Sequence, residues 1–196
     1  MKIAFATAAL PDTGTAVVLA ADTALGATAA DLDRRTGGAV RRALELAGNK
    51  LKRGRAVELL CPAGIELGRV VVLGVGTPGE AKRLELEALG GSLAVKLKAL
   101  GVAEASVAVD AIDGLPFGPA QLAVCLAEGA MLRSYRFDKY RTGKDDDDDQ
   151  DEVQTLTFHL AEPASASAGS ARWNVSVWTS SWSSSSSLPV RYLSKR

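Results

Sequence analysis

The chain has 196 residues, 47% of them hydrophobic, and its 23 Lys and Arg residues balance 23 Asp and Glu residues. This length suits one ordinary domain with a tail, and the apolar content excludes a chain that is disordered throughout. With a net charge of +0, no global charge favours nucleic acid or a membrane surface as a partner.

Cysteine usage and apolar runs narrow the setting further. Cys61 and Cys125 are the only cysteines, too few for a disulfide framework. The N-terminus shows no secretory signal, and no apolar run approaches the length of a transmembrane helix. We therefore expect a cytoplasmic protein without membrane association.

In chain order, strands are predicted over residues 2–6, 15–20, 56–60, 69–75, 106–109 and 153–160. A helix is predicted around Val40 and Leu44, with Gly37 and Gly38 separating it from a shorter helix before it. A leucine stripe from Leu86 to Leu100 predicts a second helix that ends at Gly101, and a third is predicted from Leu122 to about Arg136.

This alternation predicts an α/β fold, a mixed, mostly parallel sheet with helices on both faces. The first two strands are interpreted as a possible antiparallel pair. Residues 1–160 are predicted to form the domain. Residues 161–196, which hold the run Ser183–Ser187 and all three tryptophans, are predicted to be a disordered tail because they lack a periodic apolar face.

One motif suggests a nucleotide. Gly74-Val75-Gly76-Thr77-Pro78-Gly79 matches Gly-x-Gly-x-x-Gly after an apolar strand, and Asp110 ends the next strand, where an acid could bind a ribose. Two details oppose this interpretation: Pro78 offers no N–H to a phosphate, and Asp110 lies beyond the usual spacing. A plain turn is the favoured interpretation, and a nucleotide or ADP-ribose-like ligand on the Gly74–Gly79 loop is the alternative.

The remaining candidate residues favour structural roles. His159, the one histidine, lacks ligand-spaced neighbours, and Cys61 and Cys125 are interpreted as small core residues. The acidic run Asp145–Asp149, followed by Asp151 and Glu152, is typical of a solvated linker, and the basic stretch Arg34–Arg55 of a charged helix face. Asn174-Val175-Ser176 matches a glycosylation sequon that means little without a secretory signal. We predict no catalytic, cofactor-binding or metal-binding residue.

Two segments resemble a known family. Glu128-Gly129 through Ser134-Tyr135-Arg136-Phe137-Asp138-Lys139-Tyr140 is similar to the end of the N-terminal domain of the leucyl (cytosol) aminopeptidases, and Cys61-Pro62-Ala63-Gly64 through Arg69–Gly76 to an earlier part of it. The resemblance covers roughly residues 1 to 160. It implies a macro-domain-like fold that helps to assemble a hexamer, with glycines that bind no dinucleotide.

The resemblance also implies where the chemistry lies. Members of the family remove N-terminal amino acids from peptides with two divalent metals, zinc or manganese, held in a C-terminal domain. The Asn-Thr-Asp-Ala-Glu-Gly-Arg signature of that domain does not occur here, so we expect this chain to be inactive alone and to act in assembly. Ser187-Leu188-Pro189-Val190 fits codons for Phe-Leu-Ala-Arg read one base later, which suggests a frameshift near residue 162; the neighbouring DNA frame tests this hypothesis.

Overall fold

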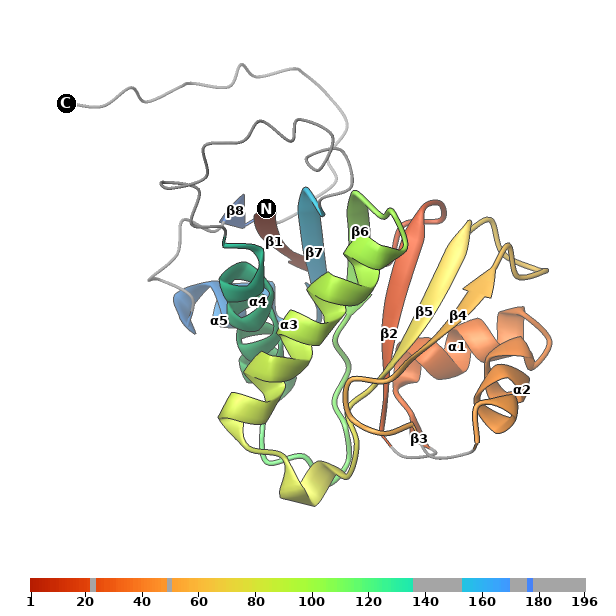
Figure 1. Ribbon diagram of the computed structural model, residues 1–196, viewed down its shortest axis with the longest axis horizontal. Coiled ribbons are helices and arrows are strands. Elements are labelled where there is room, and N and C mark those ends of the chain that lie inside the picture. The colour runs from red at the N-terminus through yellow and green to blue at the C-terminus, as the bar shows by residue number, and fades with distance from the viewer. Residues whose placement is uncertain (22–23, 49–50, 136–152, 170–175, 178–196) are drawn as a thin grey trace, which may run out of the picture.

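The computed structural model in Figure 1 describes residues 1–21, 24–48, 51–135, 153–169 and 176–177. Its strands are β1 (Lys2–Thr7), β2 (Thr15–Ala21), β3 (Ala24–Leu25), β4 (Ala56–Leu60), β5 (Arg69–Gly74), β6 (Glu104–Ala108), β7 (Thr155–Leu160) and β8 (Ser176–Val177). They form one sheet in the order β4-β5-β2-β6-β7-β1-β8, with β3 beside β2. Neighbouring strands are parallel except in the pairs β4–β5 and β2–β3. The predicted mixed, mostly parallel sheet is confirmed.

The helices are α1 (Ala27–Arg35), α2 (Ala39–Leu46), α3 (Arg83–Ala99), α4 (Pro119–Ser134) and α5 (Pro163–Gly169), and a 3₁₀ turn, η1, spans Pro78–Glu80. α3 and α4 cover one face of the sheet, and α1 and α2 pack on the other face over β2 and β5. Helices on both faces agree with the predicted layers.

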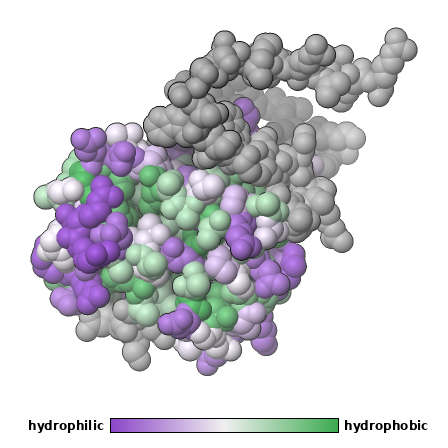
Figure 2. Space-filling model, turned by 180° about the vertical axis from the view of Figure 1, so that it is seen from behind, coloured by the Kyte–Doolittle hydropathy of each residue, from purple (hydrophilic) through white to green (hydrophobic). Residues whose placement is uncertain are grey.

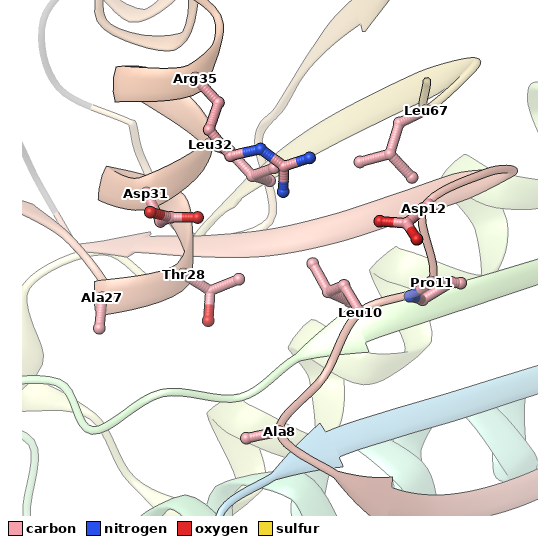
Figure 3. A pocket seen from close by; sticks show the side chains of 10 residues that line it. All are labelled: Ala8, Leu10, Pro11, Asp12, Ala27, Thr28, Asp31, Leu32, Arg35 and Leu67. Carbon is pink, nitrogen blue, oxygen red and sulfur yellow. The ribbon is translucent and has the colours of Figure 1, made fainter. Parts of the chain in front are cut away.

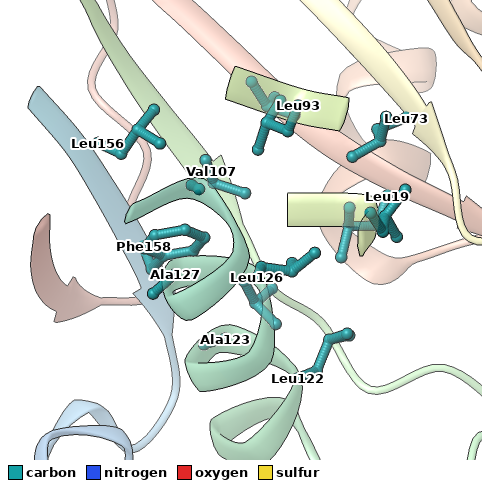
Figure 4. Close-up of a cluster of buried hydrophobic side chains, with 14 of the residues drawn as sticks. Leu19, Leu73, Leu93, Val107, Leu122, Ala123, Leu126, Ala127, Leu156 and Phe158 are labelled. Carbon is teal, nitrogen blue, oxygen red and sulfur yellow. The ribbon is translucent and has the colours of Figure 1, made fainter. Parts of the chain in front are cut away.

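The larger core lies between the sheet and the α3–α4 pair. Figure 4 shows Leu93 of α3 and Leu126 of α4 meeting Leu19, Leu73 and Phe158 from three strands. Each of these side chains is almost fully buried, which is worth about 1.5–3 kcal/mol apiece. This core holds the domain together.

The position of β5 between the two helical layers explains why its sequence is apolar at consecutive positions. Val71 and Leu73 belong to the α3–α4 core, whereas Val70 and Val72 belong to the smaller core under α1 and α2. Successive side chains of a strand point to opposite faces, so a strand covered on both faces needs no polar positions. The prediction of a doubly covered strand is confirmed.

The predicted end of the leucine-rich helix is also confirmed. Gly101 has a φ of +62°, and its N–H donates to the Lys98 carbonyl over 3.0 Å. The N–H of Val102 donates to the Leu97 carbonyl, also over 3.0 Å. This pair of bonds is a Schellman motif, in which glycine readily takes the left-handed conformation.

α3 and α4 lie unusually close together because glycines face each other across the contact. A methyl group on Gly90 would collide with the Leu126 carbonyl, and one on Gly129 with the Glu87 carbonyl. At one end of this contact, the Arg83 side chain of α3 bridges Glu87 and Glu128, at 2.7 and 2.6 Å. The two helices therefore form one tightly joined layer.

The interpretation of the first two strands as an antiparallel pair is wrong. β6 and β7 lie between β1 and β2, and all four strands run in the same direction. β1 pairs with β7 because this position brings Phe5 against Phe158, with ring centroids 5.8 Å apart, inside the main core. The turn residues Pro11 and Asp12 thus belong to a crossing between parallel strands and not to a hairpin.

The predicted domain boundary at residue 161 is too early. α5 follows β7 directly, and its Ala166 is fully buried in the main core, so the folded domain extends at least to Gly169. β8 adds a short parallel edge to β1. A serine- and alanine-rich composition hides such a helix, because its buried residues, Pro163 and Ala166, are small. The other tail residues, 170–175 and 178–196 with all three tryptophans, lie outside the described residues.

Candidate functional site

The carboxyl ends of β2, β5 and β6 meet at one edge of the sheet. After β2 the chain crosses to α1 and α2 on one face, whereas after β5 and β6 it enters α3 and α4 on the opposite face. Such a change of side is where open α/β sheets usually bind ligands. This edge carries both parts of the predicted nucleotide motif.

Asp110, the candidate ribose-binding acid, is bonded within the protein. Its carboxylate accepts hydrogen bonds from the backbone N–H of Thr28 at 2.7 Å and from the Thr28 hydroxyl at 2.8 Å. Gly26, just before α1, lies so close that a Cβ there would be 2.7 Å from Asp110 Oδ2. The N–H groups at the start of a helix attract anions, and at the start of α1 the Asp110 carboxylate already takes this place.

Two of the three glycines of the Gly74–Gly79 loop, Gly74 and Gly76, pack against the segment before β4. A Cβ on Gly74 would lie 2.7 Å from the Leu51 carbonyl, and Gly76, at a φ of +79°, faces the Arg53 side chain. The Arg53 guanidinium donates to the Val75 carbonyl at 3.1 Å and pairs with Glu85 at 2.8 Å. Protein atoms thus fill the space beside Gly74 and Gly76 that a phosphate would have to enter.

The start of α3 does not face the glycines either. The turn η1, which contains Gly79, lies between Gly76 and the helix, and Glu85 accepts the backbone N–H of Lys82 at 2.8 Å. That hydrogen bond lowers the pKa of Glu85, which favours its ionised form at the helix N-terminus. The plain-turn interpretation of the loop agrees with this geometry better than the nucleotide alternative does.

A cavity of about 290 Å³ lies between α1 and the crossing from β1 to β2 (Figure 3). Asp31 and Arg35 of α1 and Asp12 of the crossing line it, together with apolar side chains such as Leu10 and Leu67. Asp31 pairs with Arg34 at 2.7 Å. Within the described ranges, no group of three or more His, Cys, Asp or Glu residues could hold a metal ion. The cavity therefore combines charges of both signs without assembling a reactive centre.

His159 connects β7 to the end of β1. Its Nδ1 lies 3.0 Å from the Thr7 carbonyl, and its buried Nε2 has no hydrogen-bond partner. Burial is the main cause that lowers the pKa of His159 below its ordinary value of 6.5, since a charged ring would lose its hydration. The residue is positioned for a structural role, in line with its interpretation from the sequence.

A pH dependence follows from this burial. Just below pH 6.5, His159 is protonated in the unfolded chain but stays neutral in the folded protein. The free energy of unfolding is therefore retained above pH 6.5 and is lost as the pH falls through the lower pKa of the folded protein. We expect the free energy of unfolding of a His159→Asn variant to fall less between pH 7.5 and pH 5.5 than that of the unsubstituted chain. Urea titrations at the two pH values measure this. Equal losses in the two proteins would refute a contribution from His159.

The two cysteines differ from each other. Cys125 is buried in the main core, which raises the pKa of its thiol, so its interpretation as a core residue is confirmed. The same interpretation is wrong for Cys61, which is exposed. It follows β4 at a φ of +43°, and its N–H donates to the Gly68 carbonyl at 2.9 Å. Its place in the turn between β4 and β5 therefore keeps it out of the core.

The basic stretch is largely used within the fold. Arg41 pairs with the buried Asp33 at 3.1 Å, and the Arg42 guanidinium donates to the Gly37 carbonyl at 2.8 Å. Both arginines are exposed on α2, and the back of the molecule in Figure 2 shows a hydrophilic area on the side formed by α1 and α2. This agrees with the interpretation as a charged helix face.

Several candidates lie outside the described residues. They are the acidic run Asp145–Asp149 with Asp151 and Glu152, Lys50 of the basic stretch, Asn174 and Val175 of the sequon, and the family-like residues from Arg136 onward.

The α3–α4 layer also carries an exposed apolar face that was not predicted from the sequence. Leu84 and Val95 of α3 and Leu132 of α4 are exposed, as is Tyr135 directly after α4. The signal was present in α3, which has apolar residues on both sides and not only along its leucine stripe. Surfaces of this kind often mark contacts with another protein.

No helix within the described ranges has both the length and the apolar character that crossing a membrane requires.

Comparison with known proteins finds similar sequences. The model of the cytosol aminopeptidase family, N-terminal domain, matches residues 16–144. A probable cytosol aminopeptidase of Rhodopseudomonas palustris (strain ATCC BAA-98 / CGA009) is 36% identical over 170 residues, which are 85% of this chain and 33% of that protein. One from Bradyrhizobium sp. (strain BTAi1 / ATCC BAA-1182) is 40% identical over 119 residues, 59% of this chain and 23% of that protein. The chain thus spans about a third or less of the length of these curated relatives.

Solved structures show the same architecture. A mutant of tomato leucine aminopeptidase superposes with a TM-score of 0.59 at 19% identity and covers 82% of this chain and 32% of its own. A mutant macrodomain of Oceanobacillus iheyensis superposes with a TM-score of 0.59 at 13% identity and covers 87% and 89%. The predicted macro-domain-like fold is therefore confirmed.

Proposed function

We propose a function from one premise: the chain belongs to the cytosol aminopeptidase family and corresponds to its N-terminal domain. The activity that we propose for the whole protein is the removal of N-terminal amino acids from peptides. We assign this activity, and the two zinc or manganese ions that it needs, to the part of the relatives that this chain does not match. The name of the family supports a cytoplasmic location.

The chemistry of the described residues supports this division. Two divalent metals need several carboxylate, histidine or cysteine ligands around one point, and no such group occurs in the described part of the chain. A two-metal site therefore does not fit the residues of this domain that the structure describes. The carboxylates of Asp33, Glu85 and Asp110 instead accept backbone N–H groups.

The role that we propose for the domain itself is assembly of the enzyme. One observation carries this proposal: Leu84, Val95 and Leu132 are exposed on the same two-helix layer, around a groove of about 740 Å³. Apolar side chains gathered in this way gain stability when a protein partner removes them from water.

Hydrolysis of leucine p-nitroanilide tests the division of labour. We expect the purified 196-residue chain, supplied with manganese or zinc, to release nitroaniline no faster than the metal in buffer. A full-length cytosol aminopeptidase serves as the positive control. Metal-dependent turnover by the chain alone would overturn the proposal.

Assembly is tested separately by co-expression with a tagged full-length aminopeptidase subunit. We expect the chain to co-purify with that subunit in a defined ratio. Failure to co-purify, with both proteins folded, would contradict the assembly role while leaving the assignment of the chemistry intact.

A further inference from the structure

α3 is apolar on the side that faces solvent as well as on the side that faces the core. Leu86, Leu89, Leu93 and Leu97 are buried, yet on the opposite side Leu84 is 75% exposed and Val95 46% exposed. A surface helix normally carries charged or polar residues there, and a helix that is apolar all round is normally covered. In Figure 1 this side of α3 faces the viewer, and no described element crosses it.

The groove beside this face has a shape that suits a helix. Its floor on α3 consists of the small residues Ala88, Gly91 and Ser92, and Gly129 and Leu132 of α4 form its other wall. Small residues let a second helix approach closely, and the large side chains at the edges interdigitate with it. The groove therefore offers a second helix a floor of small residues that is bordered by apolar side chains.

The residues of α3 that line this groove form a self-complementary set. Consider a second α3 that runs antiparallel to the first, related by a two-fold axis midway between Gly91 and Ser92. The large Leu84 then faces Ala99, and Val95 faces Ala88. The acidic Glu87 faces the basic Lys96. Every α3 residue that lines the groove finds its partner within the same set, large against small and acid against base.

We propose that this face of α3 binds the same face of a second copy of the chain, antiparallel, around that two-fold axis. The proposal rests on the assembly role proposed above and names the surface and the partner. A contact around a two-fold axis uses one patch twice, so the patch must be complementary to itself, and α3 meets this condition in size and in charge.

The charges favour a second copy over an unrelated apolar partner. In the described part of the chain Glu87 pairs with Arg83, while Lys96 takes part in no ion pair. Both residues are half-buried at the edge of the groove. In the dimer Glu87 of each copy lies opposite Lys96 of the other copy, at both ends of the contact.

A charge exchange tests the pairing of Glu87 with Lys96. We expect the unsubstituted chain to sediment as a dimer in the micromolar range, and Glu87→Lys or Lys96→Glu to weaken dimerisation about tenfold, because like charges then meet twice. The double variant is expected to dimerise as tightly as the unsubstituted chain. The Glu87→Lys substitution also removes the ion pair of Glu87 with Arg83 within each copy. The double variant lacks this pair as well, so its loss cannot explain why the single variant is weaker and the double variant is not. A double variant as weak as the single ones would overturn the proposed pairing.

A disulfide across the axis tests the geometry. Ser92→Cys, in a Cys61→Ser background that removes the exposed native thiol, is expected to form a linked dimer under mild oxidation. Leu46→Cys is the matched control, since Leu46 is 91% exposed but lies on α2. Equal linking at the two positions would contradict the proposed axis.

Val95→Glu provides an independent check, with Leu46→Glu as its control. We expect the first substitution to abolish the dimer and the second to leave it unchanged, while circular dichroism shows that both variants are folded. An unsubstituted chain that stays monomeric would refute the self-contact. If that monomer still co-purifies with a full-length subunit, the occupant of the face is a different surface, and only the present inference fails.

Discussion

Alanine in place of Gly90 or Gly129 is expected to destabilise the domain by roughly 3 kcal/mol or more, because neither helix of the α3–α4 layer can make room for a methyl group. Each new methyl would meet a backbone carbonyl of the facing helix, that of Leu126 or of Glu87. A backbone atom can move only if the whole helix moves. Both helices contribute to the main core, so such a shift would open gaps between them and the sheet.

Gly91 offers a control one position away in the same helix. A Cβ on Gly91 would lie 3.5 Å from the Gly129 carbonyl, an ordinary contact distance. Alanine is a better helix former than glycine by about 1 kcal/mol, so Gly91→Ala is expected to be neutral or slightly stabilising. Urea unfolding at a concentration that keeps the chain monomeric measures all three variants. Similar unfolding free energies for Gly90→Ala and Gly91→Ala would show that the contact is not tight.

The same glycines bear on the proposed assembly. The groove that we propose as a docking site lies between α3 and α4, and Gly129 lines it. A variant that forces the helices apart would change the width of the groove as well as the stability of the fold. We therefore expect Gly129→Ala, where it folds, to dimerise more weakly than the unsubstituted chain.

Removing the Asp110 carboxylate is expected to cost about 1–3 kcal/mol of stability, because the half-buried Thr28 would lose its acceptor. Asp110→Ala leaves the Thr28 N–H, bonded at 2.7 Å in the folded protein, without a partner and removes a negative charge from the start of α1. Asp110→Asn keeps the shape but not the charge, so an intermediate loss is expected.

A double-mutant cycle with Thr28→Val separates this link from other effects. The Thr28 hydroxyl donates to Asp110 at 2.8 Å, so the two substitutions should be coupled by about 0.5–3 kcal/mol. Chemical unfolding of the two single variants and the double variant gives the coupling. Losses that simply add would mean that the hydroxyl contributes nothing to the link and that only the backbone bond matters.

Asp110 also illustrates the limits of a motif. From the sequence it could be a ribose-binding acid, because it follows a strand and comes after a glycine-rich loop. Only the fold shows that α1, 82 residues earlier in the chain, presents its first N–H groups to this carboxylate. A local pattern cannot distinguish an acid that waits for a ligand from one that caps a distant helix.

The sequence by itself determined the features that depend on near neighbours. The doubly covered strand β5, the helix end at Gly101 and the alternation of strands and helices were all predicted correctly, because side-chain periodicity and glycine conformations act over a few residues. The family could likewise be identified from short segments such as Glu128–Ser134, and the family model confirms it.

Tertiary structure alone decided which strands pair, that the folded domain continues past residue 160, and that a second apolar side of α3 faces solvent. β1 joins β7 because Phe5 and Phe158 share the core, although β2 is nearer in sequence. The buried residues Pro163 and Ala166 bring α5 into the domain. The outer face of α3 remains apolar although it lies in water, since burial is a property of the whole fold and no local pattern records which of two apolar sides a helix turns toward its core.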